Sequence, residues 1–308
     1  MPNFSMTGNF DLQSHVPLLD KSIDLVWNRR DQIEVFLKRF FKQTKATGGT
    51  EYKIDSISSL IGLPRVNEDS DDLPRLVSAP GFGATYTFIN YRSGLQVTRA
   101  IVESDRFGQI MESASGLAKS AVRKDEFLRA NPLNNGFSSQ TTADGVALFS
   151  NSHLQENPEI ANGDNLGTGA LSGPNLQAIR LVLKQHVNEI GVSDPVKAMV
   201  LLVTENDEQK ALELTRAPKR AEDNLNAPTV LIGSLEVVVS TFLTDADAFF
   251  LMGDRTGNQM GLHEITLAPW TIANNRPANV DIVLDKRIRA RKVIATHDWR
   301  NLAGSQGS

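Results

Sequence analysis

The sequence predicts a mixed α+β fold, and three observations support this prediction. Apolar residues recur at helical spacing over a long stretch from Ser104 to about Ala130. The preceding residues, 51 to 103, contain short β-rich runs such as ATYTFINY and GLQVTRAIV. From Pro174 onward a helix, a buried strand and a second helix follow one another, and further strands complete the chain.

The composition limits the function classes open to the chain. Its 308 residues allow about two domains at roughly 150 residues each, or one elaborated domain. Apolar residues make up 40% and charged residues 22%, a balance that excludes wholesale disorder. The net charge of −4 argues against general binding to DNA. Because there is no cysteine, disulfides, thiolate nucleophiles, zinc–thiolate sites and iron–sulfur clusters are excluded.

The hydropathy pattern bears on the location of the protein. The N-terminal residues MPNFSMTGNFDLQ have neither a basic region nor a continuous apolar run of the kind found in signal peptides. No later segment approaches the roughly 18 uninterrupted apolar residues that a membrane span needs. We therefore expect a soluble, non-exported protein without a membrane partner.

The N-terminal third is predicted to contain an arm, a helix and a long β excursion. Residues 1–22 are rich in Gly, Asn, Ser, Pro and Asp, which predicts an extended arm. A helix is predicted next, ending at Gly48-Gly49, with one apolar face made of Ile33, Phe36, Leu37, Phe40 and Phe41. Residues 51–103 are interpreted as a two-stranded excursion with an acidic tip, PRVNEDSDDLP. Because an isolated ribbon is marginal in water, we expect this excursion to lie on a neighbouring subunit.

The remaining elements follow from periodicity and capping. Ser104 is predicted to cap a helix that spans about 40 Å and ends before Asn131-Pro132. Pro174 opens a helix with Leu176, Ile179, Leu183 and Val187 on one face. The strand AMVLLV follows, and Thr204 is predicted to cap the helix ENDEQKALELTRA. The later strand candidates are LEVVVSTFL, AFFLMG, EITL, VDIVL and RIRARKVIA.

The titratable and glycine-rich motifs give no catalytic, cofactor or metal site. No two of the histidines have a local metal-ligand spacing; they are His15, His153, His186, His263 and His297. His186 is interpreted as a core or interface residue. His153 and His297 lie beside Ser152 and Asp298, but no GxSxG elbow supports a catalytic triad. The fragment GFGAT at 81–85 lacks a third glycine and is interpreted as a bend before a strand rather than a phosphate loop.

One basic run and one acidic run are candidates for contacts between subunits. The basic run is Lys286, Arg287, Arg289, Arg291 and Lys292; as a strand it would place the arginines on one face and Ile288 and Ala290 on the other. The acidic run is Glu68, Asp69, Asp71 and Asp72, which lacks the spacing of an EF-hand calcium loop. We hypothesise that the two runs meet between subunits. A solvated loop remains the alternative for the acidic run, and a solvated surface and contact with DNA remain the alternatives for the basic run.

The order of these elements resembles that of the tailed-phage major capsid proteins of Hong Kong 97 type. More closely, several stretches resemble the major head subunit family of Mu-like phages: ATYTFINYRSGLQVTRAIVESDRFG, LNNGF, DGVALFSNSHL, LLVTENDEQKALEL, VVVSTFLTDADAFFLM and HDWRNLAGSQGS. They cover most of residues 84–305. DGVALFSNSHL and the Asp-Trp-Arg ending are the specific ones, since neither follows from periodicity.

The resemblance implies a division of the chain. Residues 1–50 would form an N-terminal arm with an amphipathic helix, and residues 51–103 the E-loop. Residues 104–173 would form the spine helix and peripheral domain. Residues 174–276 would form the axial domain, and residues 277–308 would return to the peripheral domain and end in the tail.

The resemblance also implies a function without catalysis. It implies a non-enzymatic structural protein of the virion, assembled in the bacterial host cytoplasm as hexamers and pentamers into an icosahedral shell around double-stranded DNA. The implied partners are the chain itself, a separate scaffolding protein, a portal and weakly held packaged DNA; no cofactor is implied. An encapsulin-type compartment shares the fold and remains an alternative, and an α/β enzyme is a remote one.

Overall fold

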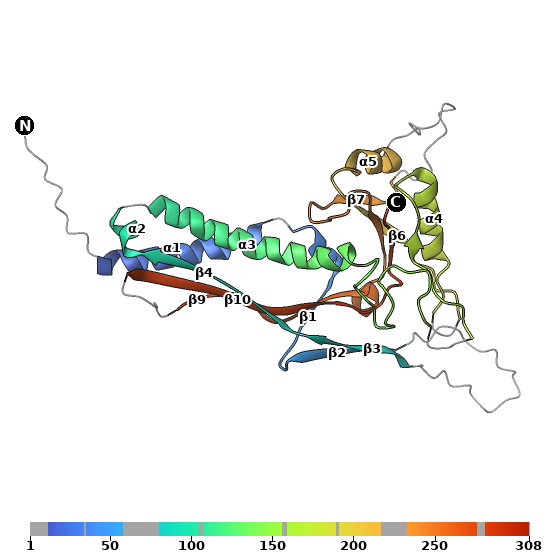
Figure 1. Cartoon of the computed structure of the whole chain (residues 1–308), viewed down its shortest axis with the longest axis horizontal. Coiled ribbons are helices and arrows are strands. Elements are labelled where there is room, and N and C mark those ends of the chain that lie inside the picture. The colour runs from blue at the N-terminus through green and yellow to red at the C-terminus, as the bar shows by residue number, and fades with distance from the viewer. Residues whose placement is uncertain are drawn as a thin grey trace, which may run out of the picture. The chain divides into compact units, whose positions relative to one another are not determined.

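The computed structural model describes residues 12–33, 35–57, 80–104, 107–155, 159–188, 191–216, 233–275 and 281–307. The chain forms two compact units. The first unit comprises residues 1–35, 89–125 and 266–292, and the second comprises residues 36–88, 126–265 and 293–308. Figure 1 traces these elements from blue at the N-terminus to red at the C-terminus.

The first unit packs helices on one face of an antiparallel sheet. Its helices are α1 (Leu12–Asn28), α2 (Arg99–Glu103) and the first part of α3 (Phe107–Asn134). Its strands are β4 (Ile89–Thr98) and parts of β9 (Leu262–Asn274) and β10 (Ile282–Thr296), and β10 pairs antiparallel with β4. Apolar side chains of α1 and α3 pack on those of β4 and β10 in two adjoining clusters.

The helix α1 corrects the predicted extended arm. The prediction gave weight to the Gly, Asn and Pro content of residues 1–22, but Leu19, Ile23 and Trp27 recur every four residues and are all buried against the sheet. The predicted helix that carries Phe36 is also wrong. Two short 3-10 helices, η1 (Arg29–Gln32) and η2 (Leu37–Phe40), and the strand β1 (Lys42–Lys45) occupy this region.

The second unit contains a five-stranded sheet in the order β5-β11-β8-β6-β7. The strands are β5 (Leu166–Gly167), β6 (Ala198–Val203), β7 (Glu236–Val239), β8 (Phe249–Gly253) and β11 (Leu302–Ser305). Helices α4 (Gly173–Lys184) and α5 (Glu208–Arg216) cover one face, while the end of α3 and η2 contribute to the core on the other. A third 3-10 helix, η3 (Gly257–Met260), precedes β9.

The base of the predicted β excursion is confirmed, and its extent is corrected. Strands β2 (Glu51–Ile57) and β3 (Pro80–Thr87) pair antiparallel. The fragment GFGAT lies inside β3, paired with β2, and is not a bend. Residues 89–98 leave the ribbon and pair with β10, and the end of GLQVTRAIV is the helix α2.

The long helix is confirmed with different ends. Ser104 follows α2, and its hydroxyl donates to the Ile101 carbonyl, so it does not cap α3. The 28 residues of α3 span about 42 Å at 1.5 Å per residue. The helix continues past Asn131 through Pro132 because Ala130 and Leu133 are both fully buried in the core of the second unit.

The α-β-α region is largely confirmed. The Ser172 hydroxyl caps α4 by accepting from the backbone N–H of Asn175, and the predicted apolar face of this helix is buried, although Val187 lies beyond its end. Thr204 is not a helix cap, because its hydroxyl donates to the Ala246 carbonyl and α5 begins four residues later. The end of the predicted strand VDIVL, from Ile282, and the whole of RIRARKVIA belong to one strand, β10. No helix of the described ranges is long and apolar enough to cross a membrane.

Candidate functional site

The basic strand β10 has two chemically different faces, as its sequence predicts. Arg287 and Arg289 are exposed and Arg291 is half-buried, whereas Ile288 and Ala290, which alternate with them, are buried. The predicted alternation is therefore confirmed.

The neighbouring strand enlarges the exposed basic surface. In the antiparallel register Arg289 lies directly opposite Arg92 of β4, and Arg287 lies opposite Gly94. Residues directly opposite on paired strands share a face of the sheet. We call this surface the arginine face; its members are Arg92, Arg287, Arg289 and Arg291.

Three members of the arginine face have no compensating ion pair in the part of the chain that the structure describes. Arg92, Arg287 and Arg289 have no ion-pair partner among the described residues. Like charges placed directly opposite on neighbouring strands destabilise a sheet. An anionic group bound on this face would relieve that repulsion.

Lys286 does not belong to this surface. Its side chain is only 2% exposed, and its ammonium group lies between Asp20 and Asp24 of α1, 2.7 Å from Asp24 Oδ1. Burial alone would raise the pKa of Asp20, but hydrogen bonds from Lys286 and Asn274 outweigh it and hold the pKa below the usual value. The predicted role of Lys286 in a contact between subunits is therefore corrected: it fastens α1 to the sheet.

Lys292 also binds a partner within its own unit. Its ammonium group donates to Asp125 Oδ1 of α3 at 2.7 Å, and the indole N–H of Trp270 donates to the same oxygen at 2.8 Å. The lysine side chain is 5% exposed. The candidate surface therefore excludes both lysines, includes Arg92, and is the arginine face. The four acidic residues proposed as its partner, Glu68, Asp69, Asp71 and Asp72, lie outside the described residues.

The second unit brings together the two most specific sequence motifs. His153, from DGVALFSNSHL, is fully buried, and its ring stacks on that of Trp299, from the C-terminal motif, with centroids 4.3 Å apart. His153 Nδ1 donates to Asp144 Oδ2 at 2.7 Å, and its Nε2 lies 3.1 Å from Asn165 Oδ1. Arg300 donates to Gln155 Oε1 at 3.0 Å. These contacts attach residues 144–155 to the C-terminal segment.

The electrostatics of this cluster fit a structural role. Burial would raise the pKa of Asp144, but hydrogen bonds from His153 and Thr142 outweigh it and lower the pKa. Burial lowers the pKa of His186 and of His297, which favours their neutral forms. His186 is buried, with its ring edge toward Trp299, which confirms the prediction of a core histidine.

The catalytic and metal interpretations find no support in this geometry. The Ser152 hydroxyl pairs with that of Ser150, while both ring nitrogens of His153 face Asp144 and Asn165. Among the described residues no group of three or more His, Asp or Glu side chains is placed to hold a metal ion.

The partners of the two buried lysines cannot be found from the sequence, because long-range folding supplies them. Asp20, Asp24 and Asp125 are remote in sequence from the lysines that they bind, so no local spacing marks them. Arg92 could have been found, since the alternation of polar and apolar residues in INYRSGLQV places it on the outer face of a strand.

The architecture of a long helix beside long strands, a β ribbon and a separate α/β unit is the Hong Kong 97-like capsid fold, as the sequence predicts. Residues 83–304 match the family described as Phage_capsid_4, phage capsid protein. The chain belongs to this family. No curated protein matches the sequence.

Solved capsid structures share this fold at low sequence identity. A structure of Mycobacterium phage Patience has a TM-score of 0.56 and 11% identity, with 98% of this chain and 90% of that chain covered. The procapsid of bacteriophage JBD30 gives a TM-score of 0.52 and 12% identity, covering 95% and 75%. The capsid of Cyanophage P-SCSP1u gives 0.54 and 7%, covering 86% of each chain.

The prediction of a phage major capsid protein is confirmed at the level of family and fold. A phage capsid protein is a component of the virion shell. The closer resemblance to the Mu-like head subunit family remains a prediction.

Proposed function

We propose that this chain is the major capsid subunit of a tailed phage, which assembles as hexamers and pentamers into an icosahedral shell around double-stranded DNA. The observation that carries this proposal is the family match over residues 83–304, together with a fold shared by three phage capsid structures. The protein has a structural role and performs no catalysis.

The assignment of chain segments to capsid parts belongs to the same proposal. Strands β2 and β3 form the base of the E-loop, and α3 is the spine helix. Residues 174–276, which include α4, β6 and α5, are the axial domain, and residues 277–308, which include β10, return the chain to the peripheral domain and end in the tail.

The proposed partners are further copies of the chain, a scaffolding protein and a portal, with assembly in the host cytoplasm. Packaged DNA is held by weak, non-specific contact. The net charge of −4 supports weak contact, because tight phosphate binding requires many basic groups.

The contact between subunits that the sequence suggested is now proposed with a corrected set of residues. The acidic tip of the E-loop of one subunit lies on the arginine face of its neighbour. Exposed ion pairs are each worth only about 0 to 1 kcal/mol. The contact repeats at every equivalent position in a closed shell, so small contributions accumulate.

Charge reversal tests this contact. Asp71→Lys with Asp72→Lys should weaken assembly, and adding Arg287→Glu with Arg289→Glu should restore it. Lys38→Glu, an exposed reversal in the second unit, is the control. Normal assembly of the acidic-tip variant, or no recovery in the combined variant, would contradict the contact. If the arginine variant alone assembles normally but loses packaged DNA, the face contacts DNA instead.

Shell contents test the function itself. Particles recovered from the native host should contain double-stranded DNA. An encapsulin-type compartment would instead contain a cargo protein and no packaged genome, and that result would contradict the proposal.

A further inference from the structure

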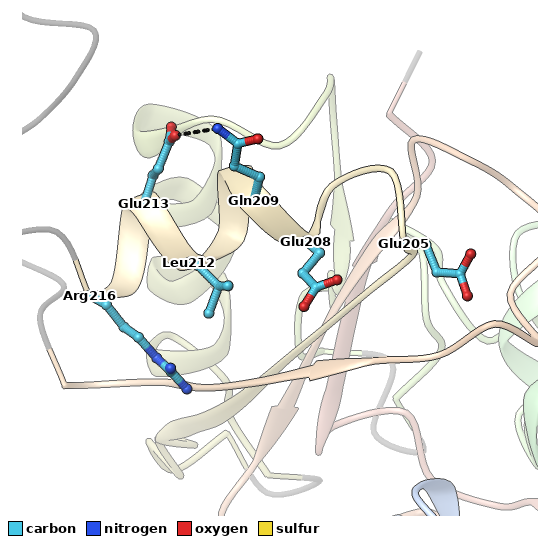
Figure 2. Close-up of a pocket in the computed structure, with 6 residues that line it drawn as sticks. All are labelled: Glu205, Glu208, Gln209, Leu212, Glu213 and Arg216. Carbon is cyan, nitrogen blue, oxygen red and sulfur yellow. Dashed lines mark hydrogen bonds between the residues drawn. The ribbon is translucent and has the colours of Figure 1, made fainter.

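The outer side of α5 carries an open hollow of about 550 Å³. Figure 2 shows the side chains that line it: Glu205, Glu208, Gln209, Leu212, Glu213 and Arg216. The lining contains three carboxylates and the apolar side chain of Leu212, and Gln209 Nε2 donates to Glu213 Oε1 at 3.0 Å. Arg216, at the end of the helix, is the one base among these six residues. The hollow therefore combines an apolar side chain with a mainly acidic lining.

The outer side of α4 has the opposite character. Leu181 is 53% exposed, a high value for a large apolar side chain in the middle of a helix. Arg180 precedes it, Lys184 lies one turn further on, and α4 contains no acidic residue. Neither of these two bases has an ion-pair partner among the described residues. The Nε atom of Arg180 is enclosed and has no hydrogen-bond partner.

The two helices lie over different ends of the same sheet. Helix α4 packs over β5, β11 and β8, and α5 packs over β6 and β7. Both contribute to one apolar cluster on one face of this sheet, whose end strands are β5 and β7 (Figure 1). Complementary surfaces at two different places on one subunit make a head-to-tail contact between copies. This contact repeats from copy to copy, and it closes a ring when the rotation between successive copies completes a full turn.

We propose that the hollow on α5 receives the outer side of α4 from a second copy of this chain. Leu181 enters the hollow beside Leu212, and Arg180 and Lys184 face Glu205, Glu208 and Glu213. The proposal rests on the proposed function, because it supplies a contact within the rings from which the shell is built. It is independent of the arginine face, which belongs to the first unit.

Charge complementarity favours a second copy over other occupants. Opposite potentials on two surfaces steer association and fix the register of a contact, while the apolar centre is withdrawn from water. The basic, apolar-centred surface that the hollow requires is present on this chain itself, so no other protein has to be assumed.

Reciprocal charge reversal tests the contact. The acidic-side variant is Glu208→Lys with Glu213→Lys, and the basic-side variant is Arg180→Glu with Lys184→Glu. Each should raise the critical concentration for assembly by about tenfold or more, which corresponds to 1.4 kcal/mol per tenfold. The combined four-residue variant should recover most of the loss. Glu112→Lys, an exposed reversal on α3 in the first unit, is the control and should assemble as the unmodified chain does.

The outcomes separate this inference from the proposed function. If the unmodified chain forms shells and either reversal leaves the critical concentration unchanged, or the combined variant recovers nothing, the α4–α5 contact is wrong while the capsid function stands. If the unmodified chain forms no shells under any condition, the proposed function fails first.

Hydrogen exchange provides a second measurement that does not depend on the variants. The amides of α5 should be protected more in assembled particles than in unassembled subunits. Equal protection in both states would mean that assembly does not cover α5, and would overturn the proposal.

Discussion

Replacing Arg129 with methionine should destabilise the second unit strongly, because this arginine pairs with two buried carboxylates. Its Nε and one terminal nitrogen donate to Glu264 at 2.9 and 2.8 Å, and the other terminal nitrogen donates to Glu126 at 2.7 Å. All three side chains are at most 4% exposed. The other oxygen of Glu126 accepts from the backbone N–H groups of Phe36 and Leu37, so the glutamate also fixes the start of η2.

The expected cost of Arg129→Met is about 3 to 5 kcal/mol, the range for removing one partner of a buried ion pair. Methionine keeps most of the apolar volume, so the loss comes mainly from the uncompensated charges. The matched control is Arg39→Met, which breaks an arginine–glutamate pair at 46% and 59% exposure and should cost about 0 to 1 kcal/mol. Urea denaturation of unassembled subunits measures both. Equal costs for the two variants would refute the reasoning.

Three further predictions concern the second unit. Stability should fall as pH drops below the ordinary histidine pKa of about 6.5, because burial lowers the pKa of His297 in the folded state. It should fall further below about pH 4, because Arg300 holds the pKa of Asp298 low against the effect of burial. Denaturation midpoints measured against pH test this, and a constant midpoint from pH 7 to 4 would contradict it. Trp299→Ala, at 3% exposure, should cost about 3 to 5 kcal/mol in the same denaturation assay, and a cost under about 1 kcal/mol would contradict its role. Gly261→Ala should lower the melting temperature more than Gly145→Ala. Both glycines have positive φ, but only at Gly261 would the new Cβ lie within 2.0 Å of a carbonyl oxygen. Equal decreases in melting temperature would mean that backbone strain alone sets the cost of both substitutions.

Elements with strong local periodicity could be predicted from the sequence. The helices α3 and α4 repeat apolar residues at helical spacing, and β6 is a continuous apolar run; the structure buries most of these residues. The ends of the helices do not follow from the same periodicity. Ser104 and Thr204 are good capping residues by type, but each makes its hydrogen bond to a carbonyl elsewhere.

The N-terminal region could not be predicted because tertiary packing decides it. The apolar spacing around Phe36 and Leu37 favours a helix, yet Glu126 binds their backbone N–H groups, and the chain turns through η2 into β1. Residues 12–28 carry Pro17 and polar residues but become helical because Ile23 and Trp27 reach the core of the first unit.

The candidate surface was predicted in part. The period of two in β10 placed the arginines on one face correctly, since alternation is a local property of a strand. The same alternation put Lys286 and Lys292 on the buried face, where only partners distant in sequence make them acceptable. All five basic residues carry the same charge in the sequence, so charge alone could not distinguish the exposed arginines from the buried lysines.

The most direct test of the central claim is electron microscopy of the purified protein as it is concentrated, combined with sedimentation velocity. We expect the chain to form closed shells, or tubes and rings of one repeating subunit, in a proportion that rises with protein concentration. A species that sediments as a monomer at every concentration and salt tested, with no particles on the grid, would contradict the assignment as a capsid subunit.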